Sequence, residues 1–219
     1  MGRITEAFTW PSHDPEWLRK TLIIGLILLI PIVGAINGLG WMLASLDRLR
    51  AGEARLAPAN LSYIVRGLRL FVVNLVYGFS VALVAALIYV PALLEASNQS
   101  HGPANPALIS LAIALSLLAF SVATLGSLAL NFAMPPIVLA TDRGGIAGGL
   151  HIGAVLRQAR ANIANTLIAG LMLIAAGFIG SLGIVACGIG VVFTTAYALA
   201  MQAWIVRSFE IGSPAATAA

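Results

Sequence analysis

The chain has 219 residues, of which 60% are hydrophobic and only 9% are charged, with twelve Lys and Arg against eight Asp and Glu. Soluble domains carry about 25% charged residues, so this composition argues against a soluble enzyme, a nucleic-acid-binding protein and a disordered linker. The single cysteine excludes an internal disulfide framework and a multi-cysteine metal site. We therefore expect an all-α integral membrane protein whose basic residues set its orientation.

Residues 1–20 are predicted to form a cytoplasmic amphipathic arm, because Ile4, Ala7 and Phe8 fall on one helical face. A helix start is predicted at Asp14-Pro15-Glu16-Trp17, since Asp is a preferred N-cap and Pro a preferred first helical residue. The first membrane segment is expected directly after this start.

Residues 21–46 are uncharged and allow two interpretations. As one helix the segment would measure about 39 Å, whereas two helices would be separated at Pro31-Ile32-Val33-Gly34. Loop 95–105 has no Lys or Arg and is predicted to be external. A hairpin at 21–46 then places all twelve basic residues on the cytoplasmic side, whereas a single crossing leaves Arg3, Arg19 and Lys20 outside. We therefore predict a helical hairpin, short or re-entrant, at 21–46.

Three later stretches are predicted to be membrane segments, at residues 70–94, 106–141 and 161–206. About 20 helical residues cross the hydrocarbon core, so the last stretch, with no charge, fits two helices joined within the glycine-dense run 177–190. A kinked exit is expected at Pro135-Pro136. With the hairpin, these segments predict a polytopic bundle of about six membrane segments.

The connecting segments complete this topology. Residues 47–69 and 142–160 are each predicted to form a cytoplasmic loop and a surface helix, and residues 207–219 a cytoplasmic tail. Both termini are therefore expected on the cytoplasmic side of the membrane.

A short pattern occurs twice and predicts an internal duplication, with chance as the alternative. The spacing R-x2-R-x4-N recurs at an offset of 91 residues, in Arg66, Arg69, Asn74 and in Arg157, Arg160, Asn165. Asp47-Arg48 and Asp142-Arg143 precede the two copies. Only the hairpin topology gives both copies the same orientation, as a parallel duplication requires.

Several motifs over residues 6–95 resemble one known family. They are Phe8-x-Trp10-Pro11, Asp14-Pro15-Glu16-Trp17-x2-Lys20, Leu29-Ile30-Pro31-Ile32-Val33 with Gly38 and Gly40, Arg50-Ala51-Gly52-Glu53 and Arg66-Gly67-Leu68. Together they are similar to a prokaryotic membrane family, domain of unknown function 4013, although Leu56–Asn60 departs from its pattern. The resemblance implies a multi-helix fold in the cytoplasmic (inner) membrane of a prokaryote and no assigned activity.

No residue is predicted to be catalytic, and no metal or cofactor is expected. His13, His101 and His151 lack a second ligand at helical spacing, so a metal or pigment site is the lesser alternative. Cys187, in an apolar glycine-rich run, is interpreted as a packing residue. No charged residue lies deep in a predicted span, which counts against proton-coupled transport.

Three groups of residues are predicted to bind or pack. Arginines three positions apart share a helical face and bind phosphate bidentately, so the lipid head-group candidates are Arg66, Arg69, Arg157 and Arg160, with simple orientation as the alternative. Amides that hydrogen-bond between helices are predicted at Asn37, Asn74, Asn131 and Asn165. Small residues that let helices approach closely are predicted at Gly34, Gly38, Ala82 and Ala86.

These features favour a non-catalytic protein, an accessory or scaffold subunit of a larger membrane complex. Its expected partners are membrane lipids and other membrane protein subunits, and no nucleic acid. The alternative is a small-solute or lipid transporter, which the repeat and the proline-broken helices favour. A lipid-modifying enzyme ranks third, because no paired acid, histidine or metal set is present.

Overall fold

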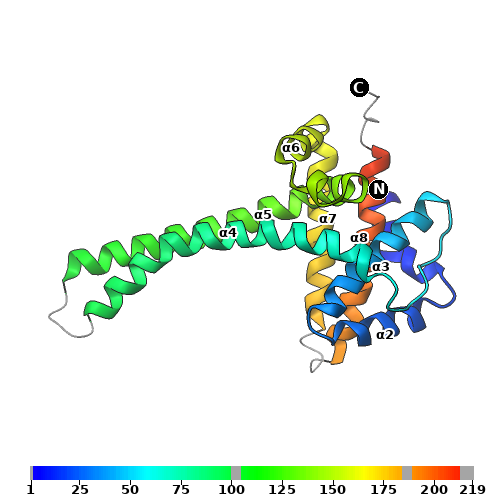
Figure 1. Cartoon of the computed structure of the whole chain (residues 1–219), viewed down its shortest axis with the longest axis horizontal. Coiled ribbons are helices and arrows are strands. Elements are labelled where there is room, and N and C mark those ends of the chain that lie inside the picture. Colours follow the sequence, from blue (N-terminus) through cyan, green and yellow to red (C-terminus); the bar gives the residue numbers. More distant parts are fainter. Residues whose placement is uncertain (1, 100–104, 184–188, 213–219) are drawn as a thin grey trace. The chain divides into compact units, whose positions relative to one another are not determined.

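The computed structural model describes residues 2–99, 105–183 and 189–212, and this part of the chain is all-helical (Figure 1). Its elements are α1 (Gly2–Thr9), the 3-10 helix η1 (Trp10–His13), α2 (Trp17–Leu28), α3 (Val33–Arg50), α4 (Ile64–Gln99), α5 (Pro106–Leu150), α6 (Ile152–Ala161), α7 (Ile163–Leu182) and α8 (Ile189–Gly212). The predicted all-α class is thus confirmed.

Three helical regions of the described chain are apolar and long enough to cross a membrane: Ile64–Glu95, Pro106–Leu150 and Ile163–Leu182. They support a membrane location. The chain divides into two compact units, which we describe separately: unit 1 is Met1–Val73 with Asn131–Ala219, and unit 2 is Asn74–Leu130.

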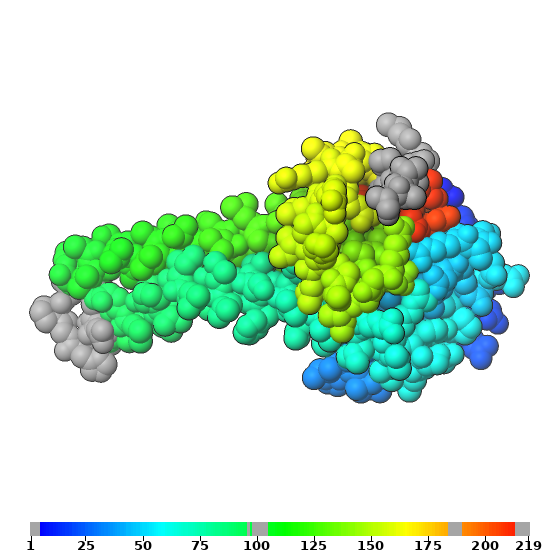
Figure 2. Space-filling view, turned by 45° about the horizontal axis from the view of Figure 1, so that its top comes forward, coloured from blue at the N-terminus to red at the C-terminus, as the bar shows by residue number. Residues whose placement is uncertain are grey.

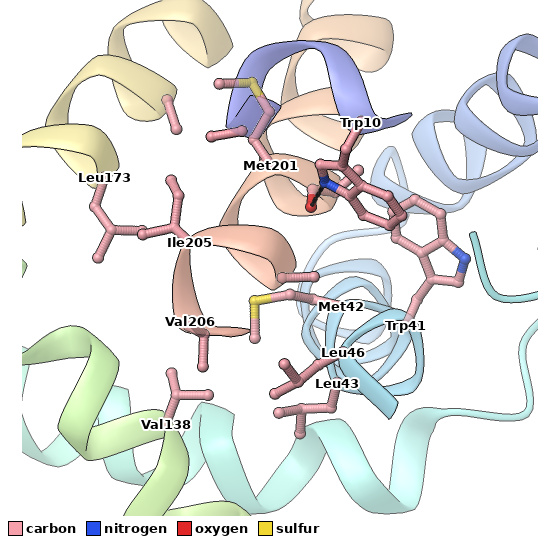
Figure 3. Close-up of a cluster of buried hydrophobic side chains, with 14 of the residues drawn as sticks. Trp10, Trp41, Met42, Leu43, Leu46, Val138, Leu173, Met201, Ile205 and Val206 are labelled. Carbon is pink, nitrogen blue, oxygen red and sulfur yellow. Dashed lines mark hydrogen bonds between the residues drawn. The ribbon is translucent and has the colours of Figure 1, made fainter. Parts of the chain in front are cut away.

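Helix α8 lies at the centre of unit 1, where α2, α3 and α7 pack against it. Small side chains at Ala196, Ala200 and Ala203 are fully buried, which lets the neighbouring helices approach α8 closely. Larger residues fill the space between these helices, and Figure 3 shows Met201, Ile205 and Val206 of α8 among residues of the surrounding helices. The core of unit 1 is therefore built around α8.

Two aromatic side chains tie the N-terminal arm to α8. The indole Nε1 of Trp10 donates a hydrogen bond to the carbonyl oxygen of Ala200 at 3.1 Å (Figure 3). The hydroxyl of Tyr197 donates to the carbonyl oxygen of Phe8 at 2.6 Å. Because buried polar groups of aromatic residues need a partner, these bonds fix where α1 and η1 lie.

Asp14, the residue expected to cap α2, is not its N-cap, because Glu16 occupies that position and makes no side-chain cap hydrogen bond. Helix α2 begins at Trp17, and the buried Asp14 accepts hydrogen bonds from the backbone N–H groups of Glu16 and Leu56, both at 2.9 Å, and from Lys20 Nζ at 2.7 Å. Burial alone raises the pKa of Asp14, but these hydrogen bonds outweigh it and hold the pKa below its ordinary value. Asp14 thereby joins the start of α2 to the segment that follows α3.

The uncharged segment 21–46 forms two helices rather than one. Helices α2 and α3 are separated at Leu29–Ile32, the region where the proline predicts a break, and Ile32 has a φ of 65°, which is rare for a β-branched residue. Gly34 lies so close to the carbonyl of Ile27 that a Cβ would overlap it. The two helices pack against each other and against α8.

The segment between α3 and α4 is irregular and is held by side chains of α3. The indole of Trp41 donates to the carbonyl of Ala57 at 3.0 Å. The fully buried Asn37 donates to the carbonyl of Asn60 at 2.9 Å and accepts from the N–H of Tyr63 at 3.3 Å. These bonds position the start of α4 beside α3.

Helix α4 begins with a close crossing over α3. A Cβ on Gly67 would overlap the carbonyl oxygen of Ile36, and a Cβ on Gly40 would overlap that of Tyr63. The separate surface helix expected within 47–69 is not found, because α4 starts at Ile64 and continues through Arg66 and Arg69 without interruption. The first turn of α4 instead packs closely against α3 through Gly67.

The expected kink of α5 lies elsewhere. Within α5, the backbone passes through the buried pair Pro135-Pro136 and leaves helical geometry at Gly145, with φ 62° and ψ −154°. Without a Cβ, glycine adopts a positive φ at little cost. The helix therefore carries Asp142 and Arg143 within its regular part instead of ending before them.

Some predicted features lie outside the described residues. These are His101 and most of loop 95–105, Cys187 and the turn between α7 and α8, and the tail beyond Gly212. The two helices that flank this turn, α7 and α8, pack against each other.

Unit 2 consists of α4 from Asn74 and α5 as far as Leu130, and its outer surface is apolar. Figure 2 shows the two helices lying along each other, with Gly126 of α5 against the side chain of Val81. Large side chains point outward: Phe79 is 64% exposed and Phe120 is 71% exposed. Such a surface requires an apolar environment, either lipid or another protein.

We predict that Gly67→Ala destabilises the protein by about 1–3 kcal/mol, because the new methyl group is forced into the backbone of α3. Gly78→Ala on the same helix is the matched control, since a Cβ there meets nothing within 4 Å and alanine favours a helix. Thermal unfolding followed by circular dichroism in a mild detergent measures both. Equal midpoints for the two variants would contradict the close crossing.

Candidate functional site

Seven charged side chains from four helices meet in unit 1, and we call them the arginine–carboxylate network. Its members are Asp47 and Arg50 of α3, Arg66 of α4, Asp142 and Arg143 of α5, and Arg207 and Glu210 of α8. Four arginines therefore face three carboxylates.

Arg50 makes four hydrogen bonds in this network and reaches all three of its carboxylates. Its Nε and Nη2 atoms bind the two carboxylate oxygens of Glu210 at 3.0 and 3.1 Å, in the bidentate geometry that planar guanidinium groups favour. Its Nη1 atom donates to Asp142 at 2.6 Å and to Asp47 at 3.1 Å. One side chain of α3 thus holds α5 and α8.

The other three arginines bind the same carboxylates as Arg50. Arg66 donates to Asp47 and, at 2.7 Å, to Asp142. Glu210 accepts from Arg143 at 3.1 Å and from Arg207 at 2.9 Å. Every carboxylate in the network therefore has at least two arginine partners.

Partial burial makes these charges depend on one another. Burial alone raises the pKa of Glu210, but hydrogen bonds from Arg50, Arg207 and Arg143 outweigh it and hold the pKa below its ordinary value. Burial lowers the pKa of Arg50, and the hydrogen bonds to Glu210 and Asp142 more than reverse this and raise it. Removing one partner therefore leaves a half-buried charge uncompensated.

A polar pocket of about 420 Å³ opens beside the network, and we call it the Arg69 pocket. It is lined by Leu43, Ser62, Val65, Arg66, Arg69, Thr141 and Asp142. Arg69 is exposed and makes no hydrogen bond or ion pair with the described part of the chain. The pocket thus combines an engaged arginine, Arg66, with an unengaged one.

A family model described as "Protein of unknown function (DUF4013)" matches residues 23–207, most of the chain. The chain belongs to this family. No curated protein and no solved structure matches the chain. The DUF4013 match includes six of the seven network residues, and Glu210 lies beyond its end. It begins after the motifs of residues 8–20 and extends beyond residue 95, so the resemblance covers a later and longer part of the chain than the sequence motifs indicate.

The two arginine pairs of the DUF4013 chain lie in different surroundings. Arg157 and Arg160 are exposed on α6 and have no ion-pair partner among residues that the structure describes. A break at Asn162, with φ −147° and ψ 84°, separates α6 from α7, whereas α4 passes through Arg66 and Arg69 without a break. The structure thus does not place the two pairs on equivalent surface helices.

The four predicted asparagines also differ. Asn37 holds the segment before α4, and Asn165 Nδ2 donates to the carbonyl of Phe209 at 3.0 Å, which joins α7 to α8. Asn74 is half-buried and forms no hydrogen bond with the described residues, and Asn131 is exposed. The Asn165 bond joins two helices that both belong to unit 1.

The predicted small residues lie in both units, and the described histidines lie on the surface. Gly38 faces side chains of Leu199 in α8 and Leu28 in α2, whereas Ala82 and Ala86 lie exposed on unit 2. His13 and His151 are exposed, and within the described ranges no group of three or more His, Cys, Asp or Glu residues is arranged to hold a metal ion.

Sequence reasoning did not find the network itself. Two local signals were present: Asp47 with Arg50 and Arg207 with Glu210 are opposite charges three residues apart, a spacing that pairs them on one helical face. Nothing in the sequence indicates that Glu210 also binds Arg50, 160 positions earlier.

We predict that Glu210→Gln destabilises unit 1 by roughly 2 kcal/mol at neutral pH, because three arginines lose an ionic partner. The folded pKa of Glu210 lies below its unfolded value of about 4.3, so this contribution is present above that pH and is lost as the pH falls through the folded pKa. The difference between parent and variant should therefore shrink on acidification. Thermal unfolding across pH measures it.

Glu6→Gln is the control, since Glu6 is exposed and has no partner among the described residues. It should leave stability unchanged at all pH values. A parent–variant difference for Glu210→Gln that stays constant from neutral to acidic pH would contradict the network's electrostatic role.

Proposed function

We propose that this DUF4013 protein is non-catalytic and acts as an accessory or scaffold subunit of a larger membrane complex. The main support for this proposal comes from unit 2, a hairpin whose large apolar side chains face outward instead of into a core of their own. In unit 1, the carboxylates of the network are each engaged by at least two arginines, which favours a structural role for them. Helices with this distribution are suited to docking against other membrane subunits and lipid.

The test is purification of the tagged full chain from its native membrane in a gentle detergent, followed by mass spectrometry of stoichiometric partners. The exposed small residues of unit 2 can be enlarged as a test. The double variant Ala82→Phe/Ala86→Phe should lose the partner, because the larger side chains prevent close approach of another helix. Leu87→Phe, exposed on the same helix, should retain it. Recovery of the chain alone, with saturable binding of a solute, would contradict the scaffold function.

A lipid or small-solute transporter is the second candidate. A hollow of about 510 Å³ within unit 2 favours it, since its lining, from residues 89–93 of α4 and 109–117 of α5, is almost wholly apolar. Its size falls within the range of ligand pockets. Such a protein would be isolated without partners and would bind its lipid in this hollow.

We further propose six membrane segments, formed by α2, α3, α4, α5, α7 and α8, with both termini on the cytoplasmic side of a prokaryotic inner membrane. The three long apolar helices support part of this count. Helices α2 and α3 have 12 and 18 residues, about 18 and 27 Å, so they form a short or re-entrant pair. The exposed Ile152 and Leu156 on α6, beside Arg157 and Arg160, are typical of a helix on the inner leaflet.

The internal duplication remains part of this proposal. In each half a helix carries Asp-Arg, at Asp47-Arg48 in α3 and at Asp142-Arg143 in α5, and the paired arginines follow. Gly67 in the first pair corresponds to Gln158 in the second, so the close crossing over α3 has no counterpart there. A parallel duplication requires α4 and α7 to cross the membrane in the same direction.

Single cysteines in a Cys187→Ser background test the topology with an impermeant thiol reagent. Asn105→Cys should react from outside, whereas Ser12→Cys, Arg55→Cys and Gln158→Cys should react only after permeabilisation. Reaction of Ser12→Cys from outside would reject the first hairpin and leave five spans. Reaction of Arg55→Cys and Gln158→Cys on opposite sides would reject the parallel duplication.

A further inference from the structure

The Arg69 pocket carries an excess of positive charge. Its lining holds two arginines, Arg66 and Arg69, and one carboxylate, Asp142. The acidic residue in the lining does not reverse this sign, since Asp142 binds Arg50 through one oxygen and Arg66 through the other. The pocket therefore favours an anion over a cation.

The pocket also offers N–H donors in the pattern that phosphate requires. Guanidinium groups have five N–H donors each. Arg66 uses two of its nitrogens for Asp47 and Asp142, and Arg69 uses none within the described chain. The two residues lie three positions apart on α4 and so share one face of the helix, from which both line the same hollow.

The fixed position of Arg66 makes this more than a flexible surface charge. Asp47 and Asp142 hold its guanidinium from two helices, and the glycine crossing beneath it sets the start of α4. Ser62 and Thr141 place hydroxyl groups in the same lining. A site in which one donor group is held in advance binds its ligand at lower entropic cost.

We propose that the Arg69 pocket binds a phosphate group, with Arg69 as the main ligand and Arg66 as a fixed second donor. The phosphate comes either from an anionic lipid head group or from a free phosphate ion. The lipid source rests on the proposed membrane function, whereas the site itself rests on the charges and donors of unit 1. The two arginines of the first pair therefore have unequal roles: Arg69 serves in binding alone, and Arg66 serves in both binding and structure.

The test is a titration of the detergent-solubilised full chain, read by native mass spectrometry, with phosphatidylglycerol in one arm and inorganic phosphate in the other. Arg69→Ala should weaken binding about tenfold, the loss expected for a charge-assisted hydrogen-bonded contact. Arg55→Ala is the matched control, because Arg55 is also exposed, has no partner in the described chain and lies outside the pocket. It should bind as the parent does.

A second pair of variants tests the pocket without removing an arginine. Val65 lines the pocket and is 73% exposed, so substitution there leaves the fold intact. Val65→Glu should weaken binding by repelling the phosphate, and its neutral isostere Val65→Gln should not. Unchanged thermal midpoints for all variants show that folding is preserved.

The arms identify the source of the phosphate. Binding of phosphatidylglycerol alone assigns a lipid head group, binding of inorganic phosphate alone assigns a free ion, and mutual competition assigns both. No binding by the parent in either arm, or equal losses for Arg69→Ala and Arg55→Ala, would overturn the proposal. Loss of phosphatidylglycerol binding in Arg157→Ala/Arg160→Ala but not in Arg69→Ala would also overturn it and assign lipid binding to α6. These readouts do not depend on whether a partner subunit is found.

Discussion

The bidentate contact between Arg50 and Glu210 joins two charged residues in a chain that has few of them. Seven of its twenty charged residues, twelve basic and eight acidic in total, belong to the arginine–carboxylate network. In a half-buried site each of these charges would be costly alone, and it is tolerated because its partners come from other helices. The network therefore requires α3, α4, α5 and α8 to be in place together. The apolar core around α8 supplies most of the burial, and the network determines which helix ends meet.

Backbone contacts make this arrangement of charges possible. Arg66 reaches Asp47 because α4 crosses α3 at Gly40 and Gly67, where side chains are absent. Asn37 and Trp41 hold the intervening segment, so that the chain enters α4 at this crossing. Unit 2 differs in principle: large apolar side chains of its described residues are exposed, so its stability depends on an apolar environment that surrounds them.

Local patterns predicted what depends on local chemistry. The uncharged stretches indicated helices, the proline at residue 31 lies in the break between α2 and α3, and the family resemblance rested on short motifs. The break in helical geometry of α5 lies at Gly145 and not at the proline pair, since glycine has no Cβ and adopts a positive φ at little cost. The network and the Arg69 pocket could not be predicted, because they depend on contacts such as Arg50 with Asp142, which lie 92 positions apart.

The central place of α8 has a consequence for biogenesis. Protein chains emerge from the ribosome from the N-terminus, and their early segments begin to fold or insert first. In this chain the arm, α2, α3 and α7 all precede the helix on which they pack. The carbonyl of Ala200, which receives the indole proton of Trp10, is synthesised 190 residues after that tryptophan. Until α8 arrives, the surfaces of these helices that face it have no permanent neighbour, so translation of this helix is the step that completes the assembly of unit 1.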